Sequence, residues 1–105
     1  MLTKLKRRFE ESRSLTRRLM PVARRILGES HRITLTMRKI FAEAIYFDAG
    51  ATLDDLREAV ATLEESERTA RRVLGGAHPL VLALESSIRL SRKALQTREA
   101  SPGTA

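Results

Sequence analysis

The 105-residue sequence has no cysteine and no tryptophan, and its aromatic residues are one tyrosine and three phenylalanines. Without cysteine, neither a disulfide framework nor a thiolate metal site can form. No apolar run approaches the roughly 20 residues that span a bilayer. Five glycines and three prolines are too few for a fibrous or low-complexity chain. The many Arg, Leu, Ala and Glu residues favour helices over strands.

Positive charge is concentrated in the first part of the chain. Residues 1–40 hold 12 Lys and Arg against three acids, whereas residues 41–105 hold eight against ten. This imbalance indicates an acidic partner, namely nucleic acid, an anionic membrane surface or an acidic protein, or else a solvated helix face. No aromatic residues interleave with the basic ones. The basic patch consists of Arg7, Arg8, Arg17, Arg18, Arg24 and Arg25.

The first 19 residues are rich in Arg and hydroxyl side chains, as transit peptides are. Glu10 and Glu11 interrupt this stretch, which also has no apolar central run. Nothing in the composition argues for an oxidising compartment. We therefore expect the cytoplasm or another reducing compartment, with import into an organelle as the alternative.

Apolar periodicity predicts four helices, separated by turns that glycine or proline marks. The expected domain covers residues 1–99, with a basic first helix over 1–27, a central helix pair over 32–74 and a last helix over 79–98. A disordered tail is expected over residues 100–105. The fold class is therefore all-α.

The first predicted helix has apolar residues at helical spacing: Leu5, Phe9, Leu15, Leu19, Val22 and Ile26. Pro21 lies inside this pattern and removes one backbone donor, so we expect a kink or a break near residues 19–20. Gly28 is expected to end the helix as a left-handed C-cap. Thr52 and Asp55 predict a capping box at the start of the third helix. That helix also carries two favourable i,i+4 pairs, Glu64–Arg68 and Glu67–Arg71.

Comparison of the ends of the first and third predicted helices shows an internal repeat. Residues 23–31 read ARRILGESH and residues 70–78 read ARRVLGGAH, an offset of 47 with six of nine positions identical. The repeated unit is a helix, a Leu-Gly-x-x-His turn and a second helix. A helix pair that recurs every 40–50 residues indicates an α-solenoid.

Residues 27–35 (LGESHRITL) and 74–82 (LGGAHPLVL) resemble the Leu-Gly-x-x-His-Pro-x-x-Leu signature of kinesin light chain-type tetratricopeptide repeats. The signature positions are Leu27, Gly28, His31, Leu35, Leu74, Gly75, His78, Pro79 and Leu82. The resemblance extends over about residues 15–95 and implies antiparallel helix hairpins stacked as a short α-solenoid, about two repeats in four helices. The chain departs from the family in its longer spacing and in having Arg32 at the first proline position.

The resemblance also implies a binding surface for a partner protein. Lys39, Ile40, Glu43 and Tyr46 share one side of the second helix, whereas Phe41 and Ile45 are expected in the core. The last helix repeats the pattern. The predicted partner-binding residues are Lys39, Ile40, Glu43, Tyr46, Ser87, Leu90 and Lys93.

His31 and His78 lie 47 residues apart at equivalent turns, so we expect each to cap or pack its turn rather than to share a metal ion. No catalytic order of residues and no phosphate-binding glycine loop occurs. We predict no enzyme activity, no metal and no cofactor.

The sequence therefore favours a non-catalytic protein–protein interaction scaffold, with basic residues steering an acidic segment of a partner. Two alternatives stay open. The chain is a basic helical protein that binds nucleic acid or an anionic surface, or it is a structural subunit of a larger complex.

Overall fold

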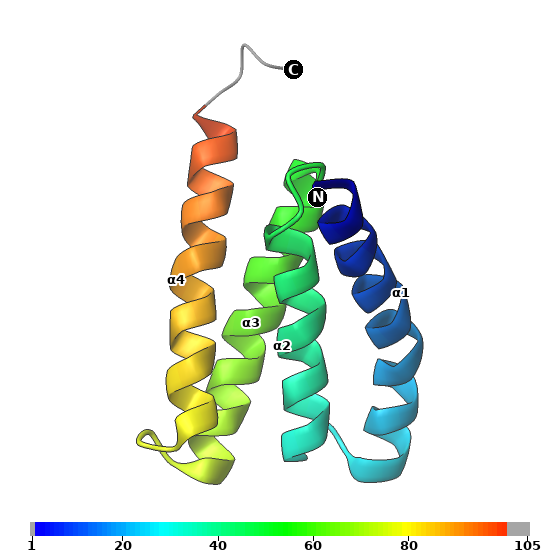
Figure 1. Ribbon diagram of the computed structural model, residues 1–105. Coiled ribbons are helices and arrows are strands. Elements are labelled where there is room, and N and C mark those ends of the chain that lie inside the picture. The colour runs from blue at the N-terminus through cyan, green and yellow to red at the C-terminus, as the bar shows by residue number, and fades with distance from the viewer. Residues whose placement is uncertain (1, 101–105) are drawn as a thin grey trace.

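The structure, a computed structural model, describes residues 2–100 as four α-helices, with no strand in that range. They are α1 (Leu2–Leu27), α2 (Arg32–Tyr46), α3 (Leu53–Leu74) and α4 (Pro79–Glu99). Each helix runs antiparallel to the next, and α1 and α4 form the two edges (Figure 1). The predicted all-α fold of stacked hairpins is confirmed. Of the expected tail, residues 101–105 lie outside the described part, and Ala100 caps α4 by donating its N–H to the Gln96 carbonyl (2.9 Å).

The turns at residues 28–31 and 75–78 lie at the same end of the molecule and share one geometry (Figure 1). Gly28 and Gly75 both have φ +92°. Each donates its N–H to the carbonyl four residues earlier, that of Arg24 or Arg71, at 3.0 Å. At Gly75 ψ is 152°, which is outside the left-handed helical region and accessible essentially only to glycine. Positive φ at both glycines confirms the predicted ends of the helices.

The two histidines occupy equivalent positions after these glycines. His31 has φ −67° and ψ 139°, and His78 has φ −66° and ψ 139°. The Nδ1 atom of each accepts the backbone N–H two residues on, at 3.1 Å from Ile33 and at 3.0 Å from Leu80. Both histidines are therefore N-caps, as expected from the sequence. Because the caps are 47 residues apart, the sequence repeat is also a repeat of local structure.

Replacing Gly75 with alanine should lower the free energy of unfolding by about 1–2 kcal/mol, because an L side chain is strained at this φ and ψ. A Cβ built there meets no atom within 4 Å, so the cost comes from the backbone alone. Gly76→Ala is the matched control, since its Cβ would meet only the flexible end of Arg71. Urea unfolding of both variants tests the prediction, and an equal loss in the two would contradict it.

A capping box starts α3, as the sequence predicts, and connects that helix to α1. The Thr52 hydroxyl accepts the Asp55 N–H at 3.0 Å, and Asp55 Oδ2 accepts the Thr52 N–H at 3.1 Å. The other carboxylate oxygen of Asp55 accepts from Arg13 Nη2 at 2.8 Å. The backbone hydrogen bond from Thr52 lowers the pKa of Asp55, and Arg13 lowers it further.

This lowered pKa makes the contribution of Asp55 depend on pH. A carboxyl whose pKa is lower in the folded state stabilises the fold fully above its unfolded pKa of about 3.9, and the gain is lost as pH falls through the folded pKa. Asp55→Ala should therefore cost about 1 kcal/mol at pH 7, and the difference from the unsubstituted protein should shrink below pH 4. Denaturant unfolding at pH 7 and at pH 2.5 measures it, and a difference independent of pH would contradict the assignment.

The core lies between α2, α3 and α4, and α1 adds Met20 and Ala23. The largest fully buried side chains include Phe41 and Ile45, as expected, together with Leu35, Leu63 and Leu84. The buried residues of α3 follow one another at intervals of three or four positions, namely Leu56, Ala59, Leu63, Ser66 and Ala70.

Polar contacts add links across α3 and α4. The predicted pair Glu67–Arg71 forms (2.7 Å), and Arg71 also reaches Glu85 of α4 (2.9 Å). The predicted pair Glu64–Arg68 does not form, because Glu64 instead pairs with Arg92 of α4. Glu64 therefore forms an ion pair between α3 and α4 instead of the predicted ion pair within α3.

The sequence-based expectations for α1 need two corrections. The helix runs without a break through Pro21, which lies on an exposed side, where water can solvate the carbonyl that lacks its helical hydrogen bond. The expected apolar stripe is also largely outside the core. Among residues 3–27, the side chains that α1 buries are those of Thr16, Met20 and Ala23. Five residues of the stripe are exposed: Leu5, Leu15, Leu19, Val22 and Ile26.

Candidate functional site

The predicted binding residues of α2 form a polar link to α4. Lys39 Nζ lies 2.9 Å from Glu43 Oε2, one turn further along α2. The same glutamate oxygen accepts a hydrogen bond from the Ser87 hydroxyl of α4 at 3.2 Å. Lys39 and Glu43 are half-buried, whereas Ser87 is buried. Glu43 and Ser87 therefore link the two helices, and Lys39 pairs with Glu43 within α2.

Tyr46 also lies at the contact between α2 and α4, and it is buried rather than presented on a surface. Its hydroxyl lies beside that of Ser87 without a hydrogen bond of ordinary geometry. Burial raises the pKa of the Tyr46 phenol, and the nearby Glu43 carboxylate raises it further, while Ser87 opposes the change. The Tyr46 phenol is therefore uncharged at neutral pH, and its side chain packs between α2 and α4.

A cleft of about 520 Å³ opens beside Tyr46, between the end of α2, the loop that follows it, α3 and α4. Its lining residues are Tyr46, Phe47, Asp48, Ala49, Leu56, Leu90, Lys93, Ala94, Thr97 and Arg98. Three of the seven predicted residues line it, namely Tyr46, Leu90 and Lys93. The other four do not: Lys39, Ile40, Glu43 and Ser87. Ile40 is exposed on α2 outside the cleft.

Arg98 holds one rim of this cleft in place. The sequence analysis did not predict this role for Arg98. Its guanidinium donates to the Ala49 carbonyl at 2.7 Å and also to the Ala51 carbonyl. Asp48 shapes the same loop, because its Oδ1 accepts the Gly50 N–H at 2.8 Å. The end of α4 therefore holds the loop between α2 and α3 in place.

The cleft combines apolar walls with a cationic rim. Tyr46, Leu56, Leu90 and Ala94 supply the apolar surface, and Lys93 lies beside them on the exposed side of α4. Within residues 2–100, Lys93 makes no ion pair. Such an arrangement suits an apolar side chain next to a carboxylate.

Part of the missed lining carried a signal in the sequence. Ala94 and Thr97 lie four and seven positions after the predicted Leu90, so extending the predicted α4 face by two turns would have found them. The loop residues had no such signal, because their place depends on the contact with Arg98.

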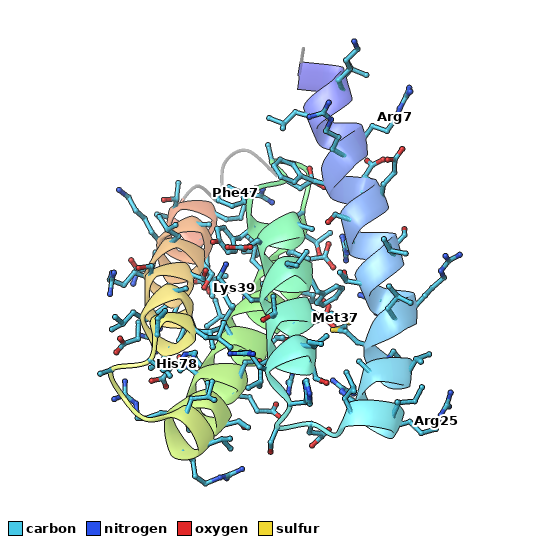
Figure 2. All side chains as sticks on the ribbon, turned by 60° about the horizontal axis from the view of Figure 1, so that its bottom comes forward. Arg7, Arg25, Met37, Lys39, Phe47 and His78 are labelled. Carbon is cyan, nitrogen blue, oxygen red and sulfur yellow. The ribbon has the colours of Figure 1, made fainter. Side chains whose placement is uncertain are left out.

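The basic patch of α1 divides into two groups. Arg17 pairs with Glu58 of α3 at 3.5 Å, and Arg24 pairs with Glu29 at 3.7 Å. Arg17 also lies 4.9 Å from the centre of the Phe41 ring. The remaining four make no ion pair among the described residues: Arg7, Arg8, Arg18 and Arg25. Figure 2 shows Arg7 and Arg25 directed away from the other helices.

The signature residues lie at the ends of α1 and α3, in the turns and in the first residues of the helices that follow. Pro79 occupies the first turn of α4, where its missing N–H costs nothing. Leu74 is partly buried against the core, whereas Leu27 is exposed. The equivalent residues Leu35 and Leu82 differ, since Leu35 is buried and Leu82 is exposed at the edge of the molecule.

No helix in residues 2–100 has the length and apolar character required to cross a membrane. Over the same residues, no three potential metal ligands are grouped. Comparisons with protein-family models, with curated proteins and with solved structures find no match to this chain.

Proposed function

We propose that this chain is a non-catalytic protein–protein interaction scaffold of the tetratricopeptide type, and that it binds a segment of a partner protein in the cleft between α2 and α4. The observation that carries the proposal is the 520 Å³ cleft itself, with its apolar walls and with Lys93 at its rim, which pairs with no acid of residues 2–100. The repeated Leu-Gly-x-x-His turns support the assignment to this type of repeat.

The residues that line the cleft indicate which kind of partner segment it binds. Leu56 and Leu90 offer an apolar surface for one or two apolar side chains. Lys93 favours a carboxylate beside it, either from Asp or Glu or from a chain end. The ligand is therefore a short segment that combines apolar and acidic residues.

Selection from a displayed library of random 12-residue peptides tests this proposal. Leu90→Glu should weaken binding of the selected peptides at least tenfold, because it places a charge on the apolar wall and opposes an acidic ligand. Leu82→Glu is the matched control, since Leu82 is a similarly exposed leucine of α4 outside the cleft. A library without binders, or equal losses in the two variants, would exclude the cleft as the site.

A second candidate function is binding of nucleic acid by α1, because one observation favours it. The helix holds nine Lys and Arg against two Glu, so its own net charge is +7. This value equals the net charge of the whole chain. If the four arginines of α1 without an ion pair in the described part of the chain contact phosphates, the logarithm of the affinity for duplex DNA should fall with the logarithm of the salt concentration at a slope of about −4. Titration of a labelled duplex between 50 and 200 mM salt measures the slope, and a shallow one would exclude this function.

A further inference from the structure

A second surface lies on α1, on the opposite edge of the molecule from α4 (Figure 1). Leu15, Leu19, Val22 and Ile26 follow at i, i+4, i+7 and i+11, so they form one stripe along the helix. All four are exposed, and Ile26 retains 71% of its accessible surface. We call these four residues the outer stripe. A stripe of large apolar side chains beyond the core indicates an interaction site.

The outer stripe continues into a shallow apolar hollow between α1 and the start of α2. The hollow has a volume of about 230 Å³, and its lining residues are Leu19, Val22, Ala23, Ile26, Leu27 and Met37. Figure 2 shows the Met37 side chain directed from α2 toward α1. The surface is therefore a groove with an apolar floor, which fits a rod-shaped ligand.

The internal repeat shows what kind of element covers such a surface. The 47-residue offset places Leu15, Leu19 and Val22 on the positions of Thr62, Ser66 and Thr69 in α3. Ser66 is 0% exposed and the two threonines are half-buried, because α3 is packed within the bundle. On the edge helix α1, by contrast, Leu19 is 37% exposed. The occupant expected from the repeat is another helix.

The positive charge beside the outer stripe indicates which kind of helix binds there. Arg18 and Arg25 follow Leu15 and Val22 by three residues, so they lie beside the outer stripe, and neither makes an ion pair within residues 2–100. A second copy would bring two strongly basic α1 helices together, which like-charge repulsion disfavours. An acidic helix would instead neutralise these arginines.

We propose that the outer stripe binds an acidic amphipathic helix of a partner protein. The helix lies along α1 with its apolar side on Leu19, Val22 and Ile26, and its flanking Glu or Asp residues lie near Arg18 and Arg25. This site is separate from the cleft, so it goes beyond the proposed function and does not depend on it.

Binding of synthetic helical peptides to the full chain tests the proposal. Each peptide has about three heptads with Leu at the a and d positions, and its flanking positions are either all Glu or all Lys. Fluorescence anisotropy should show the Glu peptide binding at least tenfold more tightly than the Lys peptide. The double variant Leu19→Ser and Val22→Ser should lose at least tenfold, and it should still fold because both residues are exposed.

A charge-reversal variant provides the sharpest result. Arg18→Glu combined with Arg25→Glu should invert the preference, so that the Lys peptide binds more tightly than the Glu peptide. Leu82→Ser and the cleft variant Leu90→Glu should leave binding of the Glu peptide unchanged, which separates failure of this site from failure of the cleft.

Three outcomes would overturn the proposal. The first is an equal affinity for the Glu and Lys peptides. The second is binding to vesicles of phosphatidylserine and phosphatidylcholine that requires Leu19 and Val22, when neither peptide binds, because the stripe would then be a membrane surface. The third is a dimer in sedimentation analysis that Leu19→Ser dissociates, because the occupant would then be a second copy.

Discussion

Leu35→Ala should lower the free energy of unfolding by about 2–5 kcal/mol, the range for removing a fully buried leucine side chain. Leu35 is 0% exposed and belongs to the core cluster, together with Phe41 and Leu84. Truncation of the Leu35 side chain to alanine removes buried apolar area. It also leaves a cavity that the surrounding helices can close only in part. Urea denaturation followed by circular dichroism measures the change.

The repeat itself supplies the control for this prediction. Leu82 is the counterpart of Leu35, 47 residues later and at the same place after a histidine cap, yet it is 52% exposed. Leu82→Ala should therefore cost less than about 1 kcal/mol, since much of its surface is already in water. If the two variants lost equal stability, Leu82 would be covered in solution, contrary to its place on the edge helix.

Much of this fold follows from short-range signals in the sequence. α3 begins directly after Thr52, which forms the predicted capping box with Asp55, and it ends before Gly75, which has a positive φ. The equivalence of the two turns was also predictable, since it rests on the same glycine and histidine in each copy. Local chemistry decides these features, and local chemistry is what a sequence displays directly.

The packing of α1 was not predictable in the same way. Its apolar residues point in two directions, and Met20 and Ala23 face the core while Leu15 and Ile26 do not. Helical periodicity identifies an apolar face, but it does not identify the neighbour that covers that face. The exposed stripe is therefore apparent only when the position of α2 is known.

The residues around the cleft were also only partly predictable, because helical periodicity does not show which neighbouring helix covers a face. Tyr46 and Ser87 share the predicted sides of their helices with exposed residues such as Leu90, yet the contact between α2 and α4 buries both. A small polar residue such as serine occurs on exposed and on interhelical faces, so its type gives little guidance. Arg98 lies 49 residues from the Ala49 carbonyl to which it donates, and no local pattern predicts such a contact.

Arg38→Met should raise the free energy of unfolding by up to about 4 kcal/mol, the upper end for replacing a buried ion pair with apolar residues of similar volume. The Arg38 side chain is only 6% exposed, and its Nε atom has no hydrogen-bond partner among the described residues. Its Nη2 atom lies 3.2 Å from Glu65, whose side chain is 57% exposed. Arg38 therefore carries a desolvation cost that its mostly hydrated partner offsets only in part.

The exposure of Glu65 is the reason that this substitution should stabilise the protein. Methionine keeps most of the volume of the arginine stem, and the glutamate that remains is free to be hydrated, so no buried charge loses its partner. Arg38→Ala should not give the same gain, because it removes the packing of the stem as well as the charge. Glu65→Gln should lower stability, since it leaves the buried guanidinium without a counter-charge. Chemical denaturation of the three variants distinguishes these effects, and a loss of stability in Arg38→Met would mean that the buried guanidinium has a net stabilising contact.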